Sequence, residues 1–246
     1  MKMIVGDYKL YRKKHLDTVF FDKFKTYQKF FDFSKPLVVF DVGANEGQTI
    51  EEYRERYPNS IIHAFEPDPV SFKKMKENTS EQLNLFYNNN ALGKMLEKKE
   101  LFQNPYDCIN SFYKVDKKND SVVSNIHPKI GGSFNVDSVV VDVMSLDDYV
   151  QISKVEKINI LKIDVSGFEP EVLEGARNSL KNQKIDLINV QVLVDHIYEK
   201  NVSFTDLEKH LIPYGYFLYD ICHIYKDINI GKTYWLDAIY ISHSLK

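Results

Sequence analysis

The sequence is poor in the features that mark several common protein classes. Its 246 residues include only two cysteines, Cys108 and Cys222, which excludes a disulfide framework or a four-thiolate metal site. It contains no run of the ~18 apolar residues that a membrane-spanning helix requires. Neither charge sign prevails, because 32 Lys and Arg stand against 35 Asp and Glu, and this balance argues against a general nucleic-acid binder.

What is present is typical of a soluble α/β protein. Hydrophobic residues make up 43% of the chain and charged residues 27%, close to the average of folded globular proteins. Charged residues occupy Met1 to Lys14, where a signal peptide would need an apolar core, so we expect a cytoplasmic protein. Between Asp7 and Phe33 aromatic residues recur at spacings of three and four, which predicts an amphipathic helical segment over 1–35. This segment would pack onto the main domain, or form the face of a homodimer or a lid over a ligand.

From residue 36 to 246, short apolar runs alternate with helical patterns. Strands are predicted at 37–40, 61–65, 83–87, 139–141, 158–165 and 185–194, and helices at 48–56, 70–77, 169–180 and 204–211. This alternation is typical of βαβ units and a parallel sheet. Two further strands, 216–225 and 234–242, have no helix between them and are expected to be antiparallel. Polar residues and glycines dominate 104–138, which is predicted to be an irregular insertion.

The first candidate site lies where the strand at 37–40 turns into a helix. Asp41 ends the strand, Gly43 permits a sharp turn, and Gly47 opens a helix whose free N–H groups face the crevice above the sheet. Glu66 ends the next strand, where a carboxylate commonly accepts hydrogen bonds from the two hydroxyls of a ribose. A dinucleotide would need G-x-G-x-x-G, which is absent, and Asp41 would repel a phosphate but attract a sulfonium or amino group. The charge argument therefore favours S-adenosylmethionine over NAD.

Seven segments, taken in their order along the chain, form a specific set of motifs. The segments are Phe40 to Gly47, Ala64 to Asp68, Ala91 to Gly93, Ser145 to Tyr149, Leu161 to Ala176, Gly215 with Tyr216, and Trp235 to Ala238. Together they resemble the FkbM family of S-adenosylmethionine-dependent methyltransferases. The resemblance implies a Rossmann-like α/β domain with a mostly parallel seven-stranded sheet, helices on both faces and an antiparallel C-terminal hairpin. It also implies which residues border the cofactor: Asp41, Gly43 and Asn45 at the methionine end, Glu66 at the ribose, and Asn90 and Ala91 at the adenine.

A second candidate site follows the strand at 158–165. Lys162 and Asp164 point to the same face, and Asp164 lies at the carboxyl end of the strand, where open α/β sheets bind ligands. We expect Asp164 to orient or deprotonate an acceptor hydroxyl, because methyl transfer needs an aligned oxygen and removal of its proton. An N-terminal helix cap is the competing interpretation of Asp164.

Two positions depart from the family pattern near this second site. Ser166 and Leu193 stand where the family often has carboxylates, so a metal site built from carboxylates is not expected. Asp195 and His196, just past the strand at 185–194, are candidate replacements, and His196 could accept a proton near neutral pH.

The predicted function is O-methylation of a hydroxyl on a sugar, a glycan precursor or a related small molecule. A catalytically inactive module that keeps the fold is the main alternative, because Ser166 and Leu193 remove two carboxylates from the acceptor side. A nucleotide-dependent oxidoreductase or another sugar-modifying enzyme is the third hypothesis.

Overall fold

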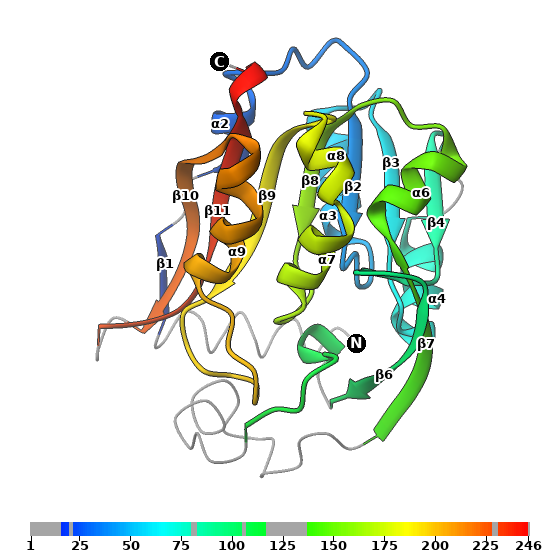
Figure 1. Cartoon of the computed structure of the whole chain (residues 1–246), viewed down its shortest axis with the longest axis vertical. Coiled ribbons are helices and arrows are strands. Elements are labelled where there is room, and N and C mark those ends of the chain that lie inside the picture. Colours follow the sequence, from blue (N-terminus) through cyan, green and yellow to red (C-terminus); the bar gives the residue numbers. More distant parts are fainter. Residues whose placement is uncertain are drawn as a thin grey trace.

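The computed structural model describes residues 16–19, 22–79, 83–104, 107–116, 137–227 and 231–245. Its largest feature is a sheet of eight strands in the order β1-β10-β11-β9-β8-β2-β3-β4 (Figure 1). These strands are β1 (Leu16–Val19), β2 (Val38–Val42), β3 (Ile61–Phe65), β4 (Leu85–Asn88), β8 (Ile158–Ile163), β9 (Ile185–Leu193), β10 (Tyr216–Asp227) and β11 (Lys232–Ser242). The pairs from β4 to β9 are parallel, and β11 runs antiparallel to both β9 and β10. The predicted α/β fold with seven main strands is therefore confirmed, and β1 is an eighth.

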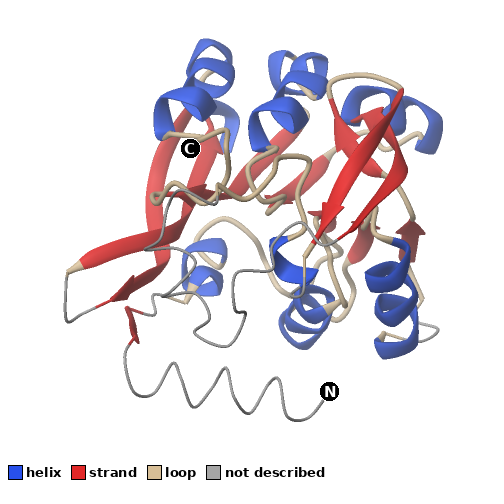
Figure 2. Ribbon diagram, turned by 90° about the horizontal axis from the view of Figure 1, so that it is seen from below, coloured by secondary structure: helices blue, strands red, loops and turns tan. Residues whose placement is uncertain are grey.

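Helices cover both faces of this sheet, as predicted (Figure 2). On one face lie α2 (Lys23–Tyr27), α3 (Gln48–Arg56) and α4 (Pro69–Asn78), and on the other α6 (Leu146–Ser153), α7 (Glu169–Gly175), α8 (Arg177–Lys181) and α9 (Phe204–Leu211). Because side chains alternate along a strand, Val39 and Ile160 pack under the first group and Phe40 and Leu161 under the second. Strands β8 and β9 consist almost wholly of buried residues, since helices cover both of their faces.

The helix starts are set by side chains that accept backbone hydrogen bonds. Asp68, Ser145 and Ser203 cap α4, α6 and α9 in this way. The helix predicted over 169–180 is instead two helices, α7 and α8, which meet at Ala176. The end of α7 packs directly on backbone, because a Cβ at Gly175 would lie 1.9 Å from the carbonyl oxygen of residue 93.

A second sheet of three strands, in the order β5-β7-β6, adjoins the main one. It consists of β5 (Ala91–Gly93), β6 (Glu97–Gln103) and β7 (Asp137–Ser145), and three short 3-10 turns complete the described elements: η1 (Asp107–Ile109), η2 (Ile212–Tyr214) and η3 (His243–Leu245). The sequence predicts only the centre of β7. It gives no strand signal for β6, because Glu97, Lys98 and Glu100 are exposed and replace the alternation of apolar side chains.

The predicted N-terminal helical segment is in part a strand. Strand β1 pairs antiparallel with β10, Leu16 opposite Asp227, which corrects the helical expectation for these four residues. The short helix α2 follows, capped by Asp22. Residues 1–15 and 20–21 of this segment lie outside the described residues, as do residues 105–106 and 117–136, which make up most of the predicted insertion. The division into a segment over 1–35 and a domain over 36–246 stays a prediction.

Candidate active site

Two glycines make the sharp turn between β2 and α3 possible. Gly43 adopts a φ of +82°, and a Cβ there would lie 1.9 Å from the carbonyl oxygen of Asp164. Gly47, at the start of α3, adopts a φ of +93°, and a Cβ there would lie 2.6 Å from Thr79 Cγ2. Glycine is required at both positions, because a side chain would separate the end of β8 from the turn and α4 from α3.

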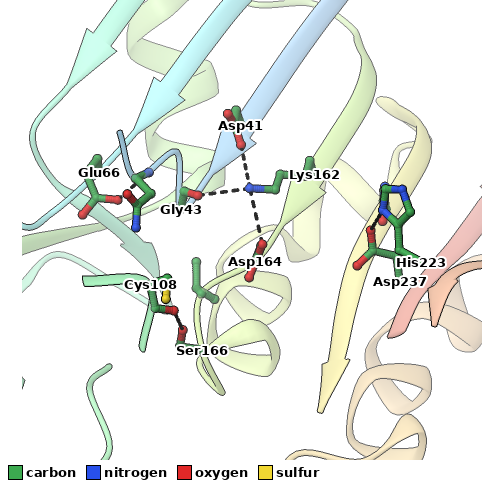
Figure 3. A network of polar contacts seen from close by, with 12 residues as sticks. Asp41, Gly43, Glu66, Cys108, Lys162, Asp164, Ser166, His223 and Asp237 are labelled. Carbon is green, nitrogen blue, oxygen red and sulfur yellow. Dashed lines mark hydrogen bonds and ion pairs between the residues drawn. The ribbon is translucent and has the colours of Figure 1, made fainter. Parts of the chain in front are cut away.

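Asp41 and Lys162 form a buried ion pair next to this turn (Figure 3). The side chain of Asp41 has no exposed surface, and its Oδ1 lies 3.0 Å from Lys162 Nζ. The same ammonium donates a 3.0 Å hydrogen bond to the carbonyl oxygen of Gly43 and lies 3.7 Å from Asp164 Oδ2. Burial lowers the pKa of Lys162, but the nearby carboxylates of Asp41 and Asp164 raise it above its usual value. Lys162 is therefore charged.

This ion pair alters the charge argument made from the sequence. A preference for a sulfonium over a phosphate requires an unpaired carboxylate at Asp41 facing the ligand, whereas Lys162 offsets the charge of Asp41. What Asp41 does in the structure is to hold Lys162, which in turn fixes the carbonyl group of Gly43.

Glu66 ends β3 within reach of two backbone donors. Its Oε2 accepts a hydrogen bond from the N–H of Asn45 and its Oε1 from the N–H of Asp68, each 2.9 Å long. Burial raises the pKa of Glu66 to about 7, although both hydrogen bonds act in the opposite direction. Each carboxylate oxygen has a further lone pair, so Glu66 can still accept the two hydrogen bonds of a ribose diol.

The residues predicted at the adenine lie beside Glu66. Asn89 Nδ2 donates a 2.9 Å hydrogen bond to the carbonyl oxygen of Glu66, and the N–H of Glu66 donates to the carbonyl of Asn88. The next residue, Asn90, is half-buried and its Nδ2 donates to the carbonyl oxygen of Ala91, 3.0 Å away. The structure thus brings the predicted ribose and adenine residues together at the ends of β3 and β4.

Asp164 lies just past the end of β8, beside Gly43. Its side chain is 39% exposed, so a ligand could reach the carboxylate. Desolvation by its surroundings raises the pKa of Asp164, and the ammonium of Lys162 acts against this increase. The competing interpretation as a helix cap is wrong, because α7 begins after Phe168 and has no side-chain cap.

Glu169, which no sequence motif marks as a site residue, holds the turn after Asp164. Its Oε1 accepts 3.1 Å hydrogen bonds from the N–H groups of Val165 and Gly167. Ser166 and Gly167 adopt left-handed φ angles of +55° and +97°, so the turn depends on such support. The side chain of Glu169 has no exposed surface, and burial raises its pKa to about 7.

The segment that contains η1 connects the two halves of the site. Ser111 Oγ donates a 2.7 Å hydrogen bond to the carbonyl oxygen of Ser166. Lys74 Nζ lies 2.6 Å from Glu46 Oε1, next to the start of α3, and 3.2 Å from Asp107 Oδ2 in η1. The described part of the predicted insertion is therefore tied both to the first glycine turn and to the turn after β8.

The two predicted replacements for the missing carboxylates lie on the loop after β9. Asp195 is buried, and its Oδ2 forms a 2.8 Å ion pair with Lys232. His196 is exposed, with its Nδ1 2.5 Å from Asn201 Nδ2. Asp195 is engaged in the ion pair with Lys232, and the catalytic roles of Asp195 and His196 stay predictions.

A histidine that the sequence did not mark, His223, is paired with Asp237 (Figure 3). Its Nδ1 lies 3.1 Å from Asp237 Oδ2, and both side chains are partly buried. His223 adopts a left-handed φ of +47° where the register between β10 and β11 shifts. The pair could not be foreseen, because it depends on the register of two strands. Among the described residues, no cluster of three or more His, Cys, Asp or Glu side chains could hold a metal ion.

An open α/β sheet with a glycine turn and acidic residues at the ends of its strands defines a Rossmann-like domain that binds its ligand at this edge. The profile of the methyltransferase FkbM domain matches residues 41–218. The chain therefore belongs to the FkbM methyltransferase family. This confirms the predicted resemblance to the FkbM family.

Two relatives of known name match parts of the chain. Methyltransferase 1 of Beauveria bassiana is 30% identical over 156 residues, which cover 61% of this chain and 61% of that protein. Hexuronic acid methyltransferase AglP of Haloferax volcanii is 25% identical over 158 residues, which cover 64% of this chain and 57% of that protein. The chain thus spans about three fifths of the length of these relatives.

Among solved structures, the fibrillarin pre-rRNA processing protein of Methanococcus jannaschii aligns with a TM-score of 0.47 at 13% identity. The alignment covers 86% of this chain and 69% of that one. In the part of the chain that the structure describes, no helix is long and apolar enough to cross a membrane.

Proposed function

We propose that this chain transfers a methyl group from S-adenosylmethionine to a hydroxyl of a sugar, a glycan precursor or a related small molecule. The observation that carries the proposal is the joint position of the Gly43 turn, Glu66 and Asp164 at one edge of the sheet. Family membership supports the reaction class, and the name of the Haloferax volcanii relative supports a saccharide acceptor.

The residues at this edge fit the cofactor. Glu66 has lone pairs left for a ribose diol, and Gly43 lets the turn after β2 approach the end of β8, so that Asp164 lies at the same edge. Asn45 would border the methionine end, and Asn90 and Ala91 the adenine. When bound, S-adenosylmethionine supplies a methyl group that its sulfonium makes electrophilic.

The chain's own residues would orient the acceptor and take up its proton. Asp164 presents a partly exposed carboxylate beside the turn, and its raised pKa suits it to accept the proton of the hydroxyl as the new C–O bond forms. Lys162, 3.7 Å from that carboxylate, holds it in place and also fixes the turn through the carbonyl of Gly43. Such positioning contributes much of the acceleration in an in-line displacement.

Calorimetric titration with S-adenosylhomocysteine tests the cofactor site. The wild type should bind, and Glu66→Ala should weaken binding by about 1–3 kcal/mol, because hydrogen bonds to a buried diol are lost. Glu55→Ala, an exposed change on α3, is the matched control and should leave the affinity unchanged. Undiminished binding by Glu66→Ala would reject the assignment of Glu66 to the ribose.

The departures at Ser166 and Leu193 favour one alternative, an inactive module that binds the cofactor. A labelled-methyl assay on extracted polysaccharides and small molecules distinguishes the two functions. Incorporation that Asp164→Asn abolishes supports the enzyme. Binding of S-adenosylhomocysteine without incorporation into any fraction supports the inactive module.

A further inference from the structure

The register of the sheet places polar side chains in one row beyond Asp164. Lys162 on β8 pairs with Asn189 on β9. Two residues further along, and hence on the same face, come Asp164 and Gln191, and Gln191 pairs with Asp237 on β11. Neighbouring strands lie about 4.8 Å apart, so the row from Asp164 to Asp237 spans about 10 Å. That length suits a ring that carries several hydroxyls better than an isolated hydroxyl.

Asp237 is held in a fixed position in this row. The Nδ1 of His223, on the neighbouring strand, lies 3.1 Å from its Oδ2, and the backbone of His223 is left-handed at this irregular position. The side chain of Asp237 remains 20% exposed. Its charge also acts on Asp164, where it adds to the larger effect of desolvation in raising the pKa. Asp237 and Asp164 therefore belong to one continuous polar surface.

The charges of this surface exclude one class of acceptor. The ammonium of Lys162 lies 3.0 Å from Asp41 and 3.7 Å from Asp164, and Asp237 adds a third carboxylate at the far end of the row. An anionic acceptor such as a uronic acid would meet net repulsion here. The hydroxyls of a neutral sugar are donors that carboxylate and amide oxygens can accept.

We propose that Asp164, Gln191 and Asp237 form the acceptor subsite and that this subsite selects a neutral saccharide over a uronic acid. Asp237 and Gln191 bind hydroxyls on the far side of the sugar ring, and the reacting hydroxyl lies at Asp164. His223 is a positioning residue that orients Asp237. The inference rests on the proposed function and adds the class of acceptor to it.

Methyl transfer to matched pairs of sugars tests the selection. The acceptors are the methyl glycosides of glucose and galactose and the corresponding methyl glucuronide and galacturonide, each with labelled S-adenosylmethionine. We expect at least one neutral glycoside to react about tenfold faster than its uronide, or more. Faster transfer to the uronides would overturn the proposal. So would the absence of transfer to every neutral glycoside by protein that methylates a uronide or a fraction of the extract, whereas protein that binds S-adenosylhomocysteine but methylates nothing would refute the proposed function instead.

Variants test the residues of the subsite. Asp237→Asn should raise KM for the neutral glycoside about tenfold and leave the affinity for S-adenosylhomocysteine unchanged. His223→Ala should also raise KM, and His223→Gln, which keeps an N–H donor, should restore part of the loss. The matched control is Glu174→Gln, which breaks another histidine–carboxylate pair, with His210 at 3.3 Å, between α7 and α9. An unchanged KM in Asp237→Asn would overturn the assignment.

Discussion

Asp41 is wholly buried, and the ammonium of Lys162 lies 3.0 Å from its carboxylate. Desolvation of two such groups cancels most of their attraction, so the pair adds little net stability. Removing one partner has a much larger effect, because the other charge is then buried without compensation. The pair matters for the site as well, since Lys162 also binds the carbonyl of Gly43.

Replacing Lys162 by Met should therefore lower the free energy of unfolding by about 3–5 kcal/mol. Urea denaturation followed by circular dichroism measures this. The double variant Asp41→Asn/Lys162→Met should recover part of the loss, because it buries no unpaired charge. Lys98→Met, which breaks an exposed ion pair with Asp142, is the control and should cost at most about 1 kcal/mol. A loss in Lys162→Met as small as that of the control would contradict the buried-pair argument.

Individual residues of the site could be predicted from the sequence, but their partners could not. Gly43, Glu66 and Asp164 follow apolar runs, and in a parallel sheet the ends of such runs meet at one edge. The ion pair of Asp41 with Lys162 joins strands that are far apart in the sequence and depends on their register. The same holds for His223, whose contact with Asp237 arises at an irregular position between β10 and β11.

At the scale of elements, the turn from β2 to α3 decides how closely β8 can approach. Gly43→Ala should lower the free energy of unfolding by about 3 kcal/mol or more, because the new Cβ would overlap the carbonyl of Asp164 and the φ at this position is positive. The variant should also lose binding of S-adenosylhomocysteine. Gly231 has a similar φ of +71°, but a Cβ added there would meet no atom within 4 Å. The control variant Gly231→Ala therefore shows the effect of backbone strain alone, and it should lower the free energy of unfolding by about 1 kcal/mol. Urea denaturation measures both free energies of unfolding. Equal losses in the two variants would show that the close approach of Gly43 to the carbonyl of Asp164 is unimportant.

Elements with strong local patterns could be predicted closely. The helix at 48–56 and the strand at 61–65 have the predicted bounds, because the apolar spacing and the flanking residues both mark them. Strand β6 could not be predicted, since its stability comes from pairing with β7 and its exposed side chains are charged. The break between α7 and α8 depends on contact with the small sheet, which the sequence does not reveal.

At the scale of the whole molecule, two buried carboxyls make stability depend on pH. Burial raises the pKa of both Glu66 and Glu169 to about 7, above the value of about 4.3 expected in the unfolded chain. Between these values the folded protein binds protons that the unfolded chain releases. These groups therefore contribute stability that is fully present below about pH 4 and is lost as the pH rises through about 7.

Glu169→Gln removes one of these titrations. At pH 5.5 the wild-type side chain is largely protonated, and at pH 8 it carries an unfavourable buried charge. We expect the Tm of the variant relative to that of the wild type to be about 5 °C higher at pH 8 than at pH 5.5. Calorimetry at the two pH values measures this shift. The exposed Glu156→Gln should show none, and a difference for Glu169→Gln that is the same at both pH values would contradict the prediction.

The pairing of β1 with β10 has a consequence for how the protein is made. Leu16 lies opposite Asp227, so the edge of the sheet joins residues from near the beginning and near the end of the sequence (Figure 1). A contact across so much of the chain closes a very long loop and forms late in folding. On the ribosome, β2, β3 and β8 emerge and can assemble before β10 exists. We expect residues 16–19 to wait without their strand partner until residues 224–227 have left the ribosome.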